Sequence, residues 1–330
     1  MKPFEYIKVT SVAQVISLLS KYQEKAALLA GGSDLLGMMK DRPEGPKFKM
    51  PQYLIDIKGI KDLTSIKEQK GGLKIGATAT LGEIASSSFV RDKYPVLVQA
   101  ASQVGVPQIR NVGTLAGNLC QRPRCWYFRR SVFKDCLRKG GGTCYAADGE
   151  NQYHAIFGTG GGCCIVYPSD LAPVLMALNA KVEIAAPKGN RMVPVDQFYV
   201  RPEKNVLREN ILAPQEMVVA VEIPPPAPSS KGIFLKAKER QAFDFAIVSV
   251  AVNLTFKNNV VADSRIAFGG IAPFPMRSIK AETELKGKEV KTSLAAACKA
   301  CIDGAQPLKN NDYKVGATAG ILEEALSLLA

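Results

Sequence analysis

Five cysteines lie in one stretch of the chain and are the residues best suited to redox or metal chemistry. They are Cys125, Cys136, Cys144, Cys163 and Cys164, of eight cysteines in 330 residues. The N-terminus shows no apolar leader, so we expect a cytoplasmic protein, in which clustered cysteines are more often metal ligands than disulfides. Thiolates suit iron–sulfur clusters and zinc. The segment predicts a redox metal centre.

A glycine turn precedes the cysteines in LLAGGSDLL, residues 28–36. Gly31 and Gly32 lack side chains, so backbone N–H groups there can approach a pyrophosphate, and Ser33 can add a hydrogen bond. The motif is neither G-x-G-x-x-G nor a phosphate-binding loop with its lysine. A plain turn between a strand and a helix explains this motif equally well.

A second turn, VGTLAGNL at 112–119, repeats the pattern with Thr114, Ala116, Gly117 and Asn118. Two such turns favour a dinucleotide, one turn holding the phosphates and the other the ribityl or flavin end. Asp170 begins the following helix and can accept hydrogen bonds from sugar or ribityl hydroxyls. Its alternative role is that of a helix N-cap.

The elements that position these turns alternate between strands and helices. Helical spacing after Thr10 or Ser11, a short strand before Gly31 and a strand in YLIDIK give an α/β unit over 1–57. A second unit, 58–223, carries the cysteine insertion at about 120–165. The run PPPAPSSKG then marks a boundary, and 224–330 alternates like antiparallel strands before closing helices.

Composition narrows the function further. The net charge is +13, from 43 basic and 30 acidic residues, but the basic residues are spread along the chain without interleaved aromatics. We therefore expect a solvated basic surface that faces an acidic partner or phosphates rather than nucleic acid. No apolar run reaches the length of a membrane span.

Five motifs follow one another in an order that resembles the FAD-binding medium subunit of the molybdenum hydroxylases. They are AGGSDLL, IGATATLGEI, VGTLAGN, PSDLAPVLMALNA and LKAKERQAFDFAIVSVAV, which span essentially the whole chain. That family includes xanthine dehydrogenase, carbon monoxide dehydrogenase and 4-hydroxybenzoyl-CoA reductase. The resemblance implies two α/β subdomains of the vanillyl-alcohol-oxidase-like FAD-binding type. An α+β domain follows, with a three-stranded antiparallel sheet and helices.

The resemblance also implies roles for individual residues. The two FAD loops correspond to Ala30, Gly31, Gly32, Ser33, Asp34 and Leu35, and to Thr114, Ala116, Gly117 and Asn118. Asp170 resembles the aspartate that contacts the ribityl chain. Lys236, Arg240 and Asp244 resemble the polar set near the isoalloxazine ring, where a cation stabilises reduced, anionic flavin. The alternative role for Lys236 is a strand-surface charge.

The cysteine insertion resembles the loop that carries a 4Fe–4S cluster in the β subunit of 4-hydroxybenzoyl-CoA reductase. Cys125, Cys136 and Cys144 match that loop, whereas the fourth ligand position falls at Tyr153, and a phenol is a poor substitute for a thiolate. Cys163 is the preferred fourth ligand, followed by Cys164 and then His154. Structural zinc and an empty loop are the alternatives.

The resemblance implies an electron-transfer subunit of a multi-subunit oxidoreductase, with no catalytic residues of its own. Its partners would be a large subunit that binds molybdopterin and a small subunit with 2Fe–2S clusters, in an αβγ unit that dimerises. NAD or a ferredoxin-like carrier would exchange electrons with it. The alternatives are a stand-alone FAD-dependent oxidase or reductase with a structural metal loop, and a non-enzymatic scaffold. The substrate is not encoded in this chain.

Overall fold

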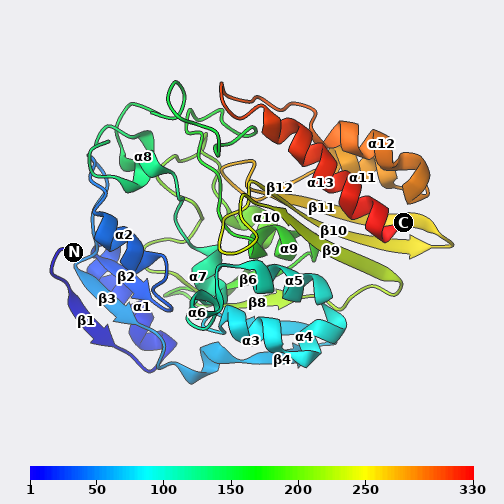
Figure 1. The fold of residues 1–330 in the computed structure, drawn as a ribbon. Helices are drawn as coiled ribbons and strands as arrows, with labels where there is room; N and C mark the ends of the chain where they lie inside the picture. Colours follow the sequence, from blue (N-terminus) through cyan, green and yellow to red (C-terminus); the bar gives the residue numbers. More distant parts are fainter.

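The N-terminal lobe is a small parallel sheet with two helices (Figure 1). A computed structural model describes all of residues 1–330. The lobe comprises β1 (Glu5–Lys8), α1 (Val12–Tyr22), the 3-10 turn Gln23–Lys25, β2 (Ala26–Leu29), α2 (Leu35–Asp41) and β3 (Tyr53–Asp56). The strand order is β1-β3-β2. Ser11 caps α1 by accepting a hydrogen bond from the Gln14 amide at 3.3 Å, which confirms one of the two expected caps.

The second lobe is an antiparallel sheet of five strands in the order β4-β5-β8-β6-β7. Its strands are β4 (Ile66–Gln69), β5 (Gly72–Gly76), β6 (Lys181–Ala185), β7 (Arg191–Pro194) and β8 (Met217–Ile223). Its helices are α3 (Leu81–Ser86), α4 (Ser88–Lys93), α5 (Pro95–Gln103), α6 (Pro107–Arg110), α7 (Leu115–Leu119), α9 (Leu171–Ala177) and α10 (Val195–Phe198), with a 3-10 turn at Lys61–Thr64. The capping box of Thr80 and Glu83 fixes the start of α3.

The stretch from Cys120 to Pro168, called here the Cys segment, has almost no regular structure. It contains only α8 (Trp126–Arg129) and a 3-10 turn (Leu137–Lys139). In Figure 1 its loops lie beside α2 and extend toward the C-terminal lobe. The segment therefore bridges the first and last parts of the chain.

The C-terminal lobe is an antiparallel sheet covered on one face by three helices. Its elements are β9 (Ser230–Ala237), β10 (Val248–Lys257), β11 (Val260–Gly269), β12 (Met276–Arg277), α11 (Ile279–Leu285), α12 (Val290–Cys301) and α13 (Tyr313–Leu329). The strand order is β12-β11-β10-β9. The sheet thus has a fourth strand, of two residues, beyond the three expected, and it pairs at Ala267 and Phe268 of β11.

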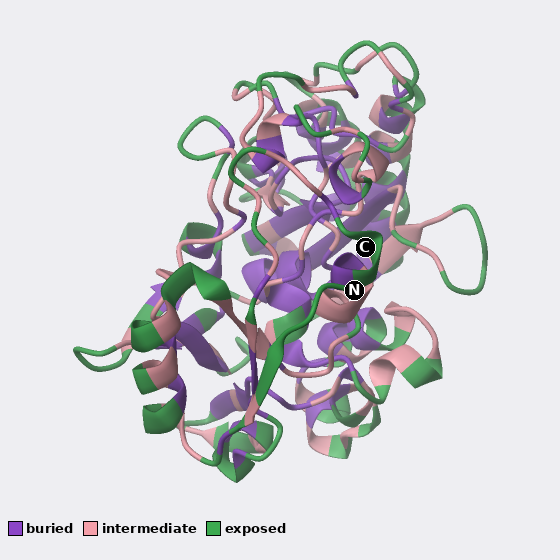
Figure 2. Ribbon diagram, turned by 90° about the vertical axis from the view of Figure 1, so that its left-hand side faces the viewer, coloured by how far each residue is buried: buried purple, intermediate pink, exposed green.

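The lobes share their cores, because each side of the C-terminal sheet is buried. Phe234, Ala251 and Ala267 join the core of the second lobe, whereas Val250 and Val252 pack toward α11–α13. Figure 2 shows the buried residues running through the middle of the molecule, with the exposed ones at its loops and outer helices. The expected mixed α/β architecture, followed by a C-terminal domain with an antiparallel sheet and helices, is present. No helix has the length and apolar character needed to span a membrane.

Candidate flavin and cysteine site

The first glycine turn joins β2 to α2. Gly31 lies against the second turn so closely that a Cβ there would sit 1.8 Å from the Val112 carbonyl oxygen. Gly32 has a φ of +71°, which L side chains rarely adopt. The two turns therefore meet with bare backbone between them. The cavity beside them is lined by the six residues expected here, Ala30, Gly31, Gly32, Ser33, Asp34 and Leu35.

The second turn is fixed by Thr114, which caps α7. Its hydroxyl accepts a hydrogen bond from the Gly117 amide at 3.1 Å, and its backbone forms a bridge to Thr80. Thr114 and Gly117 line the same cavity as the first turn, and Asn118 lines the next cavity. Ala116 lines neither cavity, so the structure leaves one expected residue beside the site rather than in it.

Three cavities follow one another from the glycine turns to the C-terminal sheet. The first, at the turns, holds about 280 Å³, the second about 120 Å³ and the third about 560 Å³. Asp34, Thr114 and Gly117 line both the first and the second cavities, and Asp170 and Asp244 line both the second and the third. The result is one elongated channel, here called the flavin channel, whose shape suits a dinucleotide-length ligand.

Asp170 and Lys236 form a buried ion pair at the middle of the channel. Lys236 Nζ lies 2.7 Å from Asp170 Oδ2, and both side chains are almost fully enclosed. Burial raises the pKa of Asp170 above its ordinary range, and the neighbouring ammonium of Lys236 limits the rise. Ser169, not Asp170, caps α9, because its hydroxyl accepts from the Ala172 amide at 3.1 Å. The carboxylate of Asp170 therefore faces the channel rather than its own helix.

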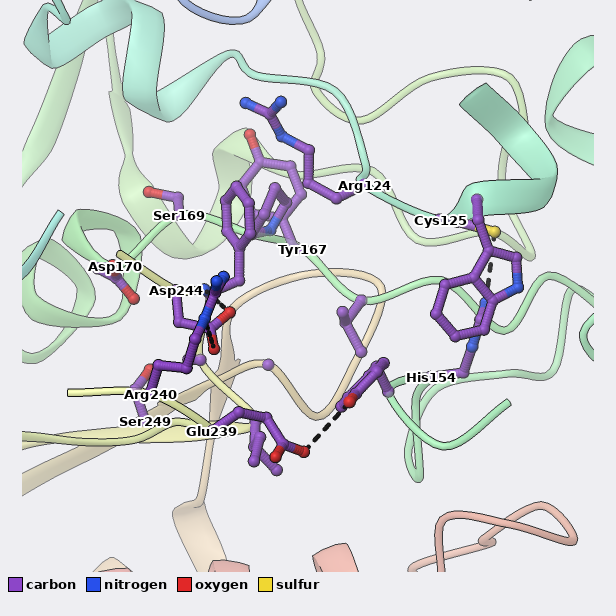
Figure 3. Close-up of a pocket in the computed structure, with 18 residues that line it drawn as sticks. Arg124, Cys125, His154, Tyr167, Ser169, Asp170, Glu239, Arg240, Asp244 and Ser249 are labelled. Carbon is purple, nitrogen blue, oxygen red and sulfur yellow. Dashed lines mark hydrogen bonds and ion pairs between the residues drawn. The ribbon is translucent and has the colours of Figure 1, made fainter. Parts of the chain in front are cut away.

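The loop after β9 covers the wide end of the channel. The exposed Arg240 and the half-buried Asp244 form an ion pair of 3.5 Å there, and the ring of Phe245 lies 5.0 Å from the Arg124 guanidinium. Figure 3 shows Arg240 and Asp244 beside each other, with Arg124 on the neighbouring segment. The structure thus brings Asp170, Lys236, Arg240 and Asp244 to one channel, as expected from the sequence.

The channel walls contain polar atoms without protein partners. The Ser249 hydroxyl and the Nε of Arg124 are buried and make no hydrogen bond within the protein. Both residues line the widest cavity. Buried polar groups in a folded protein are normally hydrogen-bonded, so these two atoms point to a polar ligand. Together with the glycine cradle, they fit FAD.

Five of the six cysteines of the Cys segment, all but Cys120, lie near one another. Cys125 lines the widest cavity of the flavin channel, and Cys136, Cys163 and Cys164 are buried. Burial raises the pKa of Cys125 to about 12, with further contributions from Cys163 and Cys136. A hydrogen bond from Cys164 lowers the pKa of Cys144 below its ordinary value. Four cysteines expected as ligands, and the alternative Cys164, therefore share one neighbourhood.

Neighbouring backbone amides lower the pKa values of three of these thiols. Hydrogen bonds from the amides of Tyr127 and Phe128 favour a Cys125 thiolate, against the larger effect of burial. The Arg138 amide does the same for Cys136, and the amides of Ala146, Ala147 and Cys164 do so for Cys144. Such hydrogen bonds are characteristic of sulfur that carries negative charge, as in iron–sulfur proteins.

Buried cations surround the same thiols. The side chain of Arg138 is 1% exposed and pairs with Glu209 at 2.8 Å. Burial lowers the pKa of Lys139, and the nearby thiols of Cys136 and Cys125 oppose that shift. His154 places Nε2 3.3 Å from Cys125 Sγ, as Figure 3 shows. The donor set suits a negatively charged, thiolate-bound group.

The fourth family position, Tyr153, is a poor candidate for a ligand in the structure as well as in the sequence. The residue is 40% exposed, and its hydroxyl donates to Glu239 at 3.1 Å. No three His, Cys, Asp or Glu side chains are close enough to chelate a single metal ion. The compact tetrahedron that zinc requires is therefore not formed by these side chains.

Several residues of the site were not singled out from the sequence as cofactor ligands. Gln121, Arg124, Ser169 and Ser249 line the flavin channel. Arg124 directly precedes Cys125 in the sequence, and nothing in that position indicates that its side chain lines the channel. Ser249 lies opposite Lys236 in the β9–β10 ladder, so strand pairing was the only signal that could have identified it.

Two family descriptions match almost the whole chain. The "FAD binding domain in molybdopterin dehydrogenase" matches residues 2–226, and the "CO dehydrogenase flavoprotein C-terminal domain" matches residues 233–326. The chain belongs to the FAD-binding subunits of the molybdenum hydroxylases, a family of molybdenum-containing oxidoreductases. The family resemblance noted in the sequence is confirmed.

Named relatives cover nearly the same length. The chain is 34% identical over 319 residues to the aldehyde oxidoreductase FAD-binding subunit PaoB of Escherichia coli, covering 96% of this chain and 94% of that protein. It is 29% identical to the carbon monoxide dehydrogenase medium chain of Hydrogenophaga pseudoflava, covering 98% and 96%. A solved structure of carbon monoxide dehydrogenase from that organism superimposes with a TM-score of 0.77 at 28% identity, covering 99% of this chain and 96% of that one.

Proposed function

We propose that this chain holds FAD along the flavin channel and carries electrons between partner subunits and an external acceptor or donor. The glycine turns, with Ala30 to Leu35 and Thr114 to Asn118, would hold the diphosphate and its neighbours. Asp170 would receive the ribityl hydroxyls, and Lys236, Arg240 and Asp244 would lie near the ring. When bound, FAD supplies the exchange between one-electron and two-electron carriers.

The residues of the chain itself support this chemistry by fixed charge. Lys236 is held by Asp170 at 2.7 Å and by the Gln103 carbonyl at 3.3 Å, so its ammonium cannot swing away. A cation fixed at the flavin ring favours the reduced, anionic form. The Phe243–Phe245 loop and the Arg124 side chain line the channel, where the Arg124 guanidinium lies 5.0 Å from the Phe245 ring.

We also propose that Cys125, Cys136, Cys144 and Cys163 hold a 4Fe–4S cluster beside the channel. The amide hydrogen bonds to Cys125, Cys136 and Cys144 and the buried Arg138 and Lys139 support a charged thiolate cluster. Cys163 is preferred over Cys164 because it lies close enough to raise the pKa values of Cys125, Cys136 and Arg138.

The partners follow from the family. We propose a heterotrimer with a large molybdopterin-binding subunit and a small subunit with 2Fe–2S clusters, dimerised to (αβγ)2. Electrons would pass through 2Fe–2S clusters, FAD and the 4Fe–4S cluster to or from NAD or a ferredoxin-like carrier. The PaoB relative is named for an aldehyde oxidoreductase and another for carbon monoxide dehydrogenase; the large subunit would select the substrate.

One observation carries the proposal: Cys125 lines the same cavity as Asp170, Arg240 and Asp244. A metal centre on the Cys segment would therefore adjoin the flavin ring, within reach for electron transfer. The test is a count of FAD and metal in the anaerobically purified full chain, with Cys136→Ser as the ligand variant. We expect one FAD and four irons per chain, and no intact cluster in the variant.

A matched control uses Cys298→Ala, since Cys298 is a buried thiol on α12 far from the segment in sequence. That variant should retain all four irons. Zinc without iron in the native chain would refute the cluster. A chain that stays colourless after incubation with FAD would refute the flavin site, and turnover of a substrate by the chain alone would favour a stand-alone oxidase or reductase.

A further inference from the structure

Asp34 ends the first glycine turn but does not use its side chain there. Aspartate is a preferred N-cap, yet Asp34 makes no side-chain capping bond to α2. Its carboxylate instead accepts from the Arg122 amide at 2.8 Å and from Arg129 Nη2 at 2.5 Å. Arg124 Nη2 lies 3.1 Å from the same carboxylate. The carboxylate of Asp34 therefore binds residues of the Cys segment rather than its own helix.

Asp34 binds residues 122–129, here called the Cys125 arm. Within this arm, Arg129 bonds back to the first residues. Arg129 Nε donates to the Pro123 carbonyl at 2.7 Å, and Nη2 donates to the Arg122 carbonyl at 3.0 Å. Its side chain is 8% exposed, so these bonds are shielded from water. Cys125 lies within this arm, and its sulfur lies 3.3 Å from His154 Nε2. Moving Cys125 would strain every bond to Asp34.

Arg124 extends the connection into the flavin channel. Its side chain lines both the second and the widest cavities and packs on Phe245 of the C-terminal loop. The same guanidinium thus touches the glycine turn, the channel and the loop that covers it. A shift of the Cys125 arm would therefore move the channel wall both at the glycine turn and at the loop that carries Phe245.

We propose that Asp34 couples the two cofactor sites, so that a cluster bound by the cysteines raises the affinity for FAD. The inference rests on the proposed function. An occupied cysteine site fixes Cys125 and its arm, which holds Arg122, Arg124 and Arg129 on Asp34 and keeps the glycine turn in its binding geometry. Pre-organisation of this kind lowers the ordering cost of the second ligand, and the coupling is reciprocal.

The test is a titration of FAD into the full chain with its iron–sulfur cluster present and after its removal, followed by flavin fluorescence. We expect the Kd for FAD to be about tenfold lower with the cluster, within the usual range of coupling between sites. In Asp34→Asn, the ratio of the two Kd values should fall toward one, even if each Kd is itself larger than in the native chain. By reciprocity, FAD should slow the loss of iron to a chelator in the native chain.

The control is Asp41→Asn, because Asp41 is a half-exposed carboxylate only 3.9 Å from the same Arg129; it should keep the tenfold ratio. A native ratio of one, or an unchanged ratio in Asp34→Asn, would overturn the proposal. If Asp34→Asn does not fold, Arg129→Gln replaces it with the same expected loss of ratio, because Arg129 binds Asp34 and does not line the channel. A native chain without FAD or without iron would show, before any variant is made, that the proposed function itself is wrong.

Discussion

The flavin channel and the Cys segment touch each other, but different forces hold them in shape. The channel lies between regular elements whose apolar side chains form a core of 34 buried residues. The Cys segment has two short helical turns and buries charged side chains, among them Arg129, Arg138 and Lys139. Apolar packing sets a shape without a ligand, whereas buried charges need every partner in place. The segment should be the region that responds most to its cofactor.

The largest effect should follow from breaking the buried ion pairs of the Cys segment. Glu209 binds Arg138 at 2.8 Å and Arg122 at 2.9 Å. Glu209→Ala leaves the Arg138 charge buried without its partner and should cost about 3–5 kcal/mol. Denaturant unfolding would measure the loss, and limited proteolysis should cut first within residues 120–165. The control, Glu284→Ala, removes an exposed pair with Lys288 and should cost under about 1 kcal/mol.

The next effect depends on pH and concerns His154. Burial, aided by the nearby Lys314, lowers the pKa of His154 from 6.5 to about 4. Because the unfolded chain takes up a proton at higher pH than the folded one, stability should fall as pH drops from 6.5 to 4. The loss should be at most about 3 kcal/mol. Unfolding of the metal-free chain would show it, and His154→Gln should flatten that part of the pH profile.

The shape of the channel depends on the close contact of the two glycine turns, and substitutions at two glycines test that contact. Gly31→Ala would place a Cβ 1.8 Å from the Val112 carbonyl oxygen, forcing the two turns apart. We expect a loss of about 1–3 kcal/mol and weakened FAD binding. Gly37→Ala, in α2 with open space around it, should stabilise the chain by up to about 1 kcal/mol. Equal effects of the two variants would contradict the close contact of the turns.

The smallest effect should come from the loop over the wide end of the channel. Arg240 and Asp244 are 3.5 Å apart and Arg240 is exposed, so Arg240→Ala should change stability by less than about 0.5 kcal/mol. It should nevertheless alter the rate of electron exchange with an external carrier and its dependence on salt, since the residue borders the cavity. A large loss of stability would show that the loop is structural.

The sequence predicted the channel better than the segment. The helix start at Ser11 and the strands before Gly31 and in YLIDIK follow local rules of capping and alternation, and they formed as expected. The two-residue strand β12 and the helix Ile279–Leu285 were missed, because neither has a distinct local signal. The expectation that Asp34 serves the flavin turn overlooked its bonds to Arg122 and Arg129, partners about 90 positions away.

The sequence by itself determined the family, the two glycine turns and the presence of five thiols in one insertion, because motif order and residue type are local properties. Only the tertiary structure decided that Cys125 borders the flavin channel, that Ser249 and Arg124 present unpaired polar atoms to it, and that Asp34 binds the insertion. These relations depend on contacts between distant residues, which the packing of the three lobes creates and no spacing along the chain encodes.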